Sequence, residues 1–150
     1  MITRVKGTNI TNDTIGSTQI GDLTDVTIQA SQEYIQSING GSGTVTYDCG
    51  TSLIKTQSGM TANWGCNFAN LAIDSTRAVV VTLILTQGST AYLPTAAANV
   101  LINGTNSTAI KWLGGNSSPT GTASQTDVAS FTIINTGSGY VVLGQVASYS

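Results

Sequence analysis

Apolar residues in this chain alternate with polar ones over short stretches, and no apolar stripe with helical spacing persists for a dozen residues. Residues 44–47 alternate threonine with Val and Tyr, and Ala129, Phe131 and Ile133 alternate with polar residues. The segment 76–86 is almost continuously apolar and β-branched, which is typical of a strand buried on both faces. These patterns predict an all-β protein.

The expected strands are short and are separated by segments rich in Gly, Asn and Ser. Asn103-Gly104 lies between the apolar runs 100–102 and 109–112, which predicts a hairpin with a tight turn. The segment 136–139 predicts a second hairpin near the C-terminus. Short strands joined in this way favour a jelly-roll-like β-sandwich over residues 44–150.

Residues 1–43 differ from the rest and are expected to form an extended N-terminal docking or assembly arm and its linker. Isoleucines recur every five residues, which fits neither a helix nor a simple strand, and the Gly-rich segment 39–43 is the expected boundary. Such sparse apolar residues become buried only against equivalent arms or another protein; the alternative is a mobile tail with accidental spacing. The expected arm contacts are Ile10, Ile15, Ile20, Leu23, Val26 and Ile28.

Charge and composition exclude several classes of function. Charged residues make up 8% of the chain, against about 25% in an average protein, and the net charge is −2. Histidine is absent, which rules out a Ser-His-Asp triad and a His-ligated zinc site. The five basic residues are scattered, so no nucleic-acid partner is expected. No apolar run is long enough for a membrane helix and no signal-like segment opens the chain, so synthesis in a cytoplasm without membrane insertion is expected.

Cys49 and Cys66 could form a disulfide, although their spacing alone does not show one. Two reduced thiols in or near a core are favoured for a chain made in a cytoplasm. Two cysteines without histidine do not make a convincing metal site, and neither a metal nor a cofactor is expected.

The carboxylates and aromatic residues offer two weaker hypotheses. A glycan-cleaving enzyme would need two facing carboxylates, and nothing in the sequence selects a pair among Asp48, Asp74 and Asp127, so no catalytic residue is expected. Trp64, in a polar stretch, and Tyr92 are candidate contacts for a glycan. A third aromatic residue in the domain, at position 112, is expected to pack on the sheet instead.

From about residue 44 onwards, a series of short motifs follows a recognisable order and spacing. The motifs are Asn67-Phe68, Arg77, Val81-Thr82-Leu83, Gln87-Gly88, Pro94, Ile110-Lys111-Trp112, Gly114-Gly115, Pro119-Thr120-Gly121, Asp127-Val128, Ser130-Phe131-Thr132, Thr136-Gly137 and Val142-Leu143-Gly144. In these features the chain resembles a recurrent β-sandwich domain of bacteriophage virion structural proteins, met especially in phages of cyanobacteria and other marine bacteria. The two cysteines depart from the pattern of that family.

The resemblance implies a non-enzymatic virion protein and brings no catalytic residues with it. We expect a homotrimeric surface accessory, a capsid decoration or cement protein or a short head fibre, docked by its arm, because cyclic symmetry lets several arms bury their isoleucines together. Its expected partners are copies of itself, phage capsid or tail proteins and, as a further option, a host surface glycan. Its expected location is the virion surface, after synthesis in the bacterial host cytoplasm. The alternatives are a tail-fibre or baseplate component and a carbohydrate-binding module.

Overall fold

The computed structural model describes residues 32–115 and 118–150 of the chain. Within this part, Glu33–Ser150 forms a compact unit. The predicted arm contacts Ile10, Ile15, Ile20, Leu23, Val26 and Ile28 lie outside the described residues.

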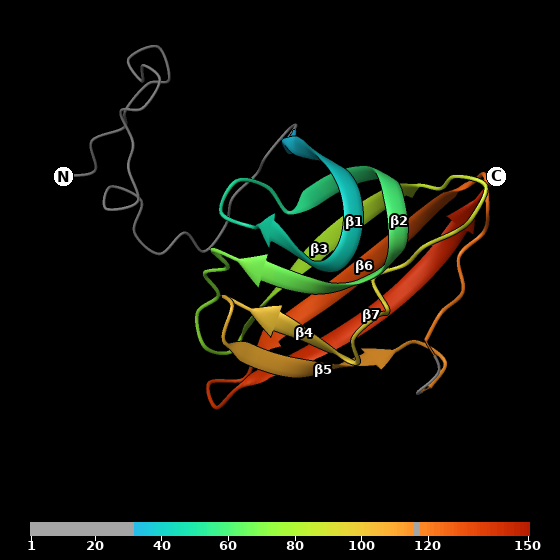
Figure 1. The fold of residues 1–150 in the computed structure, drawn as a ribbon. Helices are drawn as coiled ribbons and strands as arrows, with labels where there is room; N and C mark the ends of the chain where they lie inside the picture. The colour runs from blue at the N-terminus through green and yellow to red at the C-terminus, as the bar shows by residue number, and fades with distance from the viewer. Residues whose placement is uncertain (1–31, 116–117) are drawn as a thin grey trace, which may run out of the picture. The chain divides into compact units, whose positions relative to one another are not determined.

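The described residues form seven β-strands and no helix, so the all-β prediction is confirmed (Figure 1). The strands are β1 (Ile35–Asp48), β2 (Ile54–Ala69), β3 (Arg77–Thr86), β4 (Asn99–Ile102), β5 (Asn106–Trp112), β6 (Thr126–Asn135) and β7 (Tyr140–Tyr149). Both predicted hairpins are present: β4 pairs antiparallel with β5 across Asn103-Gly104, and β6 pairs antiparallel with β7 across the turn at 136–139. Asn103 and Gly104 both have positive φ angles, as a tight hairpin turn of this kind requires.

The sheet closes into a barrel, which differs from the two separate sheets of the expected jelly-roll-like sandwich. The strand order is β1-β2-β3-β6-β7-β5-β4, and β4 also pairs with β2. The ring closes because β2 is long enough to pair with both β3 and β4. Its residues 54–57 pair with β3, and its residues 67–68 pair with β4. Six strands therefore make the ring, and β1 lies as an additional strand along β2.

Strands β1 and β2 are parallel although only residues 49–53 connect them. A straight strand of 14 residues would be about 46 Å long, whereas the connection spans only about 20 Å. Both strands therefore bend back on themselves, as their arcs in Figure 1 show. The buried Lys55 joins the two ends of β1, because its Nζ donates to Gln36 Oε1 near the start of β1 and to the carbonyl of Asp48 at the end of β1.

The Gly-rich segment 39–43, predicted as a linker, lies inside β1, and the compact unit begins at Glu33 instead. Gly40 and Gly43 have positive φ angles, and the register with β2 shifts between Gly41 and Gly43. A Cβ at Gly41 would approach the Gln57 side chain to 2.8 Å. Glycine therefore serves here to bend a strand and to admit a close packing neighbour, rather than to separate two domains.

The core fills the barrel with one face of each strand. Val81 of β3, Phe131 of β6 and Val142 of β7 are fully buried, and Trp112 packs edge-on against Phe131 with ring centroids 5.8 Å apart. The prediction that β3 is buried on both faces is wrong for this chain, since its alternate side chains point away from the core and Val80 is 50% exposed.

Candidate assembly surface

Asp127 is held in a structural role inside the barrel. Its carboxylate is fully buried and accepts hydrogen bonds from Gln87 Nε2 at 2.8 Å, the Thr122 amide at 3.1 Å and the Ser148 hydroxyl. Gln87 in turn holds the loop before β4, because its side chain bonds both the amide and the carbonyl of Tyr92. The carboxylate thus ties three loop and strand ends together.

The other two domain carboxylates lie beside turns. Asp48 is the last residue of β1, where its oxygens accept hydrogen bonds from the Gly50 amide, Thr51 and Asn70. The bonds from Asn70 and Thr51 lower the pKa of Asp48, as expected for a carboxylate that caps a turn. Asp74 is exposed in the turn before β3, whose backbone bond runs from the Arg77 amide to the Asp74 carbonyl. No group of three or more acidic or cysteine side chains gathers among the described residues.

Trp64, predicted as an exposed glycan contact, is fully buried in the barrel, so that prediction is wrong. Its Nε1 donates to the Tyr47 hydroxyl at 2.7 Å, and that hydroxyl donates to Gln57 Oε1 at 2.6 Å. The polar neighbours of Trp64 suggested exposure, but on β2 it shares a face with Cys66 and Phe68, two and four residues later, both buried. That period of two was the signal that could have placed Trp64 inside.

Tyr92, the second predicted glycan contact, is half-buried and packs against the core. Its backbone is fixed by hydrogen bonds from and to the Gln87 side chain, and its contact with the core leaves only part of the side chain accessible. Together, the described positions of Trp64 and Tyr92 offer no exposed aromatic platform of the kind that stacks on sugars.

Cys49 and Cys66 are both free thiols and both buried, so the disulfide considered from the sequence is not formed. The strand register explains the separation: Cys66 pairs with Val45, whereas Cys49 lies beyond the end of β1 and donates its amide to the Ala69 carbonyl. Burial raises the pKa of the Cys49 thiol to about 11 and also raises the pKa of Cys66. Both groups are therefore protonated and poorly nucleophilic at neutral pH.

The outward face of β3, β6 and β7 is the most unusual surface of the domain. The three strands lie side by side in a regular register, in which Val80 pairs with Thr132 and Thr132 pairs with Leu143. Of the described residues on this face, none is charged. They are Ala78, Val80, Thr82, Ile84 and Thr86 of β3; Thr126, Val128, Ser130, Thr132 and Ile134 of β6; and Val141, Leu143, Gln145, Ala147 and Tyr149 of β7. We call this set the outer face.

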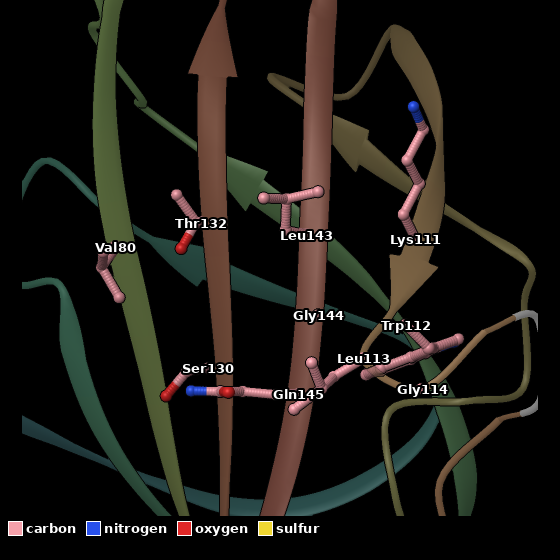
Figure 2. A pocket seen from close by; sticks show the side chains of 10 residues that line it. All are labelled: Val80, Lys111, Trp112, Leu113, Gly114, Ser130, Thr132, Leu143, Gly144 and Gln145. Atoms are coloured by element: carbon pink, nitrogen blue, oxygen red, sulfur yellow. The ribbon is translucent and has the colours of Figure 1, made fainter.

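A shallow hollow of about 560 Å³ lies over the outer face where β7 meets β5. Figure 2 shows Val80 on one side of it and Lys111 of β5 on the other, with Thr132 and Leu143 between them. Leu113, just after β5, is 79% exposed and adds apolar surface at the edge. Lys111 is the only charged side chain among the residues that line the hollow, and it stands at the rim rather than in the middle.

An uncharged sheet face with this much exposed apolar surface is suited to contact with another sheet or chain. The sequence contained its signal, the almost continuous apolar run of β3, but that run was assigned to burial within the chain. The outer face was therefore missed as a site.

Comparisons with known proteins add no relative: no protein-family model, curated protein or solved structure matches this chain. The described part of the chain also contains no helix that is long and apolar enough to cross a membrane.

Proposed function

We propose that this chain is a non-enzymatic structural protein of a bacteriophage virion: a homotrimeric accessory on the particle surface, such as a capsid decoration protein or short head fibre, docked through its N-terminal arm. The observation that carries the proposal is the outer face, an uncharged apolar sheet surface on a closed, well-packed barrel. Such a surface is suited to permanent contact within an assembly, because large exposed apolar patches mark interaction sites.

The described interior supports a structural role. The buried side-chain nitrogen and oxygen atoms of the described residues all have hydrogen-bond partners. The carboxylates that an enzyme would need accept hydrogen bonds from turns and loops instead, as Asp48 and Asp127 show. A site prepared for catalysis usually leaves perturbed, unpartnered groups in a cleft.

The resemblance of the sequence motifs to phage virion domains provides the biological setting of the proposal. The very low charge of the chain is consistent with it, because weak electrostatic repulsion favours a protein that functions in an assembled state. A tail fibre or baseplate is the alternative position on the same particle. Burial of Trp64 removes the main support for a carbohydrate-binding module.

The experiment is to purify particles of the phage that encodes the chain and to look for the chain by mass spectrometry and antibody labelling. We expect a stoichiometric surface component. A phage that carries Ile10, Ile15 and Ile20 replaced by serine should yield particles that lack the chain, while the free variant keeps the wild-type unfolding transition. Absence of the wild-type chain from purified particles would refute the proposed function.

A further inference from the structure

The outer face is an uncharged surface with nine apolar residues among its fifteen, and the chain does not cover it with its own described residues. Val80 and Leu143 are 50% and 44% exposed, and Tyr149 is 59% exposed at the other end of the face. With ten residues in each of β3, β6 and β7, the sheet area is about 500 Å² at the usual strand spacing and rise. This area includes the polar side chains of the face, and its apolar part is of the order of the patches of a few hundred Å² that mark interaction sites.

We propose that the occupant of the outer face is the equivalent outer face of a second copy of this chain, so that two copies meet face to face across a two-fold axis, a contact separate from the three-fold contact proposed for the arms. The inference rests on the proposed assembly role and assigns that role to particular residues. It differs from a contact through the arm, because every residue that it needs lies on β3, β6, β7 or the adjoining edge of β5.

The polar side chains of the outer face fit a copy of itself. They are hydroxyls and one amide, such as Thr132, Ser130 and Gln145, and each of these groups both donates and accepts hydrogen bonds. Figure 2 shows Gln145 extending from β7 towards Ser130 of β6, where it stays at the surface. Two identical faces can therefore satisfy each other without a complementary set of charges.

Charge argues against the other kinds of occupant. A lipid surface or an acidic partner would be expected to select several basic residues, and only Lys111 borders the hollow. A glycan would require an exposed aromatic ring at the hollow, whereas Trp112, the aromatic residue that lines it, is 9% exposed and lies against Gly144 and Phe131. The exposed Tyr149 stands at the far end of the outer face, outside the hollow. Because Lys111 stands at the rim, two equivalent faces can meet at their centres without bringing like charges together.

The area matches self-association of moderate strength. A standard stable interface buries about 800 Å² on each partner. The sheet supplies about 500 Å² in projection, and the relief of its side chains, Leu113 and the β5 edge increase the accessible area. Packing of two sheets at about 10 Å would bury the Val80 and Leu143 side chains, which are the most exposed aliphatic groups of the three strands.

The test uses the full-length chain in the absence of phage particles. Light scattering over a range of concentrations measures the mass of the wild type and of the double variant Val80→Lys/Leu143→Lys. We expect the wild type to associate and the double variant to dissociate with a constant on the order of a hundredfold weaker, because like charges would meet in a desolvated contact. The matched control is Thr105→Lys, since Thr105 is exposed in the turn between β4 and β5 and does not belong to the outer face.

A second measurement tests the outer face if the double variant fails to fold or if the chains associate through the arm. Thr132→Cys places one accessible thiol in the middle of the outer face, and the native Cys49 and Cys66 are buried and give little background. A short bis-maleimide should link Thr132→Cys chains into covalent oligomers, whereas Thr105→Cys, in the exposed β4–β5 turn, should stay unlinked.

Three results would overturn the inference. One is a wild type whose mass does not exceed that of a trimer at any concentration, and another is a Thr105→Cys chain linked as efficiently as Thr132→Cys. The third is a double variant of wild-type mass together with no cross-linking of Thr132→Cys. A wild type that stays monomeric would also contradict the homotrimer of the proposed function, whereas the other results concern only the outer face.

Discussion

Replacement of Asp127 by alanine tests whether the buried carboxylate has a structural or a catalytic role. In the folded chain this carboxylate accepts hydrogen bonds from Gln87 Nε2, the Thr122 amide and the Ser148 hydroxyl. Alanine removes both carboxylate oxygens and with them all three hydrogen bonds, while the backbone of β6 still pairs with β3 and β7. The strands should therefore stay in place while the loops that the carboxylate holds lose their attachment.

The magnitude follows from the donors that lose their acceptor. Ser148 is close to the surface and can turn to water, whereas the Gln87 amide hydrogen and the Thr122 amide lose a partner at partly or fully buried positions. A buried donor left without a partner costs about 1–3 kcal/mol. We therefore expect the free energy of unfolding to fall by about 2–4 kcal/mol, which lowers the urea midpoint by about 1–2 M.

Urea unfolding followed by tryptophan fluorescence measures this change, because both tryptophans, Trp64 and Trp112, are buried and become hydrated on unfolding. Asp74→Ala is the matched control. Asp74 is an exposed carboxylate in a turn, so its removal should change stability by less than about 0.5 kcal/mol.

The opposite result would have a specific meaning. Catalytic groups are commonly held at a cost in stability, so their removal tends to stabilise an enzyme. An Asp127→Ala chain with an unchanged or raised midpoint would refute the structural reading of this carboxylate. The glycan-cleaving alternative would then need a direct test of activity.

Two further predictions concern the core. Tyr47→Phe should lower the free energy of unfolding by about 2–4 kcal/mol, because the Tyr47 hydroxyl bridges a buried indole N–H and a buried amide oxygen. Scanning calorimetry measures this change, and Tyr149→Phe, at a 59% exposed position, is the control that should leave stability unchanged. Burial raises the pKa of Cys49 from 9.0 to about 11, so the folded chain retains a proton that the unfolded chain releases. Cys49 should therefore contribute about 2 kcal/mol to the fall in stability between pH 9 and pH 11, to which the buried Cys66 adds its own part. A Cys49→Ser chain that loses as much stability as the wild type over this range would contradict this assignment.

The local parts of the fold could be predicted because short-range chemistry determines them. The turn at Asn103-Gly104 requires two positive φ angles, and the alternation of Ala129, Phe131 and Ile133 requires one buried face. Neither feature depends on what lies elsewhere in the chain. Both were therefore readable from a few neighbouring residues.

The closure of the barrel and the bend of β1 depend on contacts between distant residues. A glycine-rich segment is equally consistent with a linker and with a bent strand. Only the residues of β2 that pack against segment 39–43, such as Gln57, make it a strand. Sequence alone does not show that β2 pairs with both β3 and β4, which is what turns a sheet into a ring. The sandwich expectation differed from the structure for this reason.

The apolar run of β3 connects the incorrect prediction to the proposed contact. Apolar surface that stays in water gives up about 25 cal/mol of stabilisation per Å². A strand in which nearly every residue is apolar is therefore less stable when either of its faces remains exposed. Within the chain, only the face with Val81, Leu83 and Leu85 is buried, while Val80 lies half exposed on the other face. The pattern therefore indicates burial on both sides, and the described chain supplies only one of them. If Thr132→Cys chains cross-link through their outer faces, the second side is supplied by another copy, and the composition of β3 reports the assembly rather than the fold of a single chain.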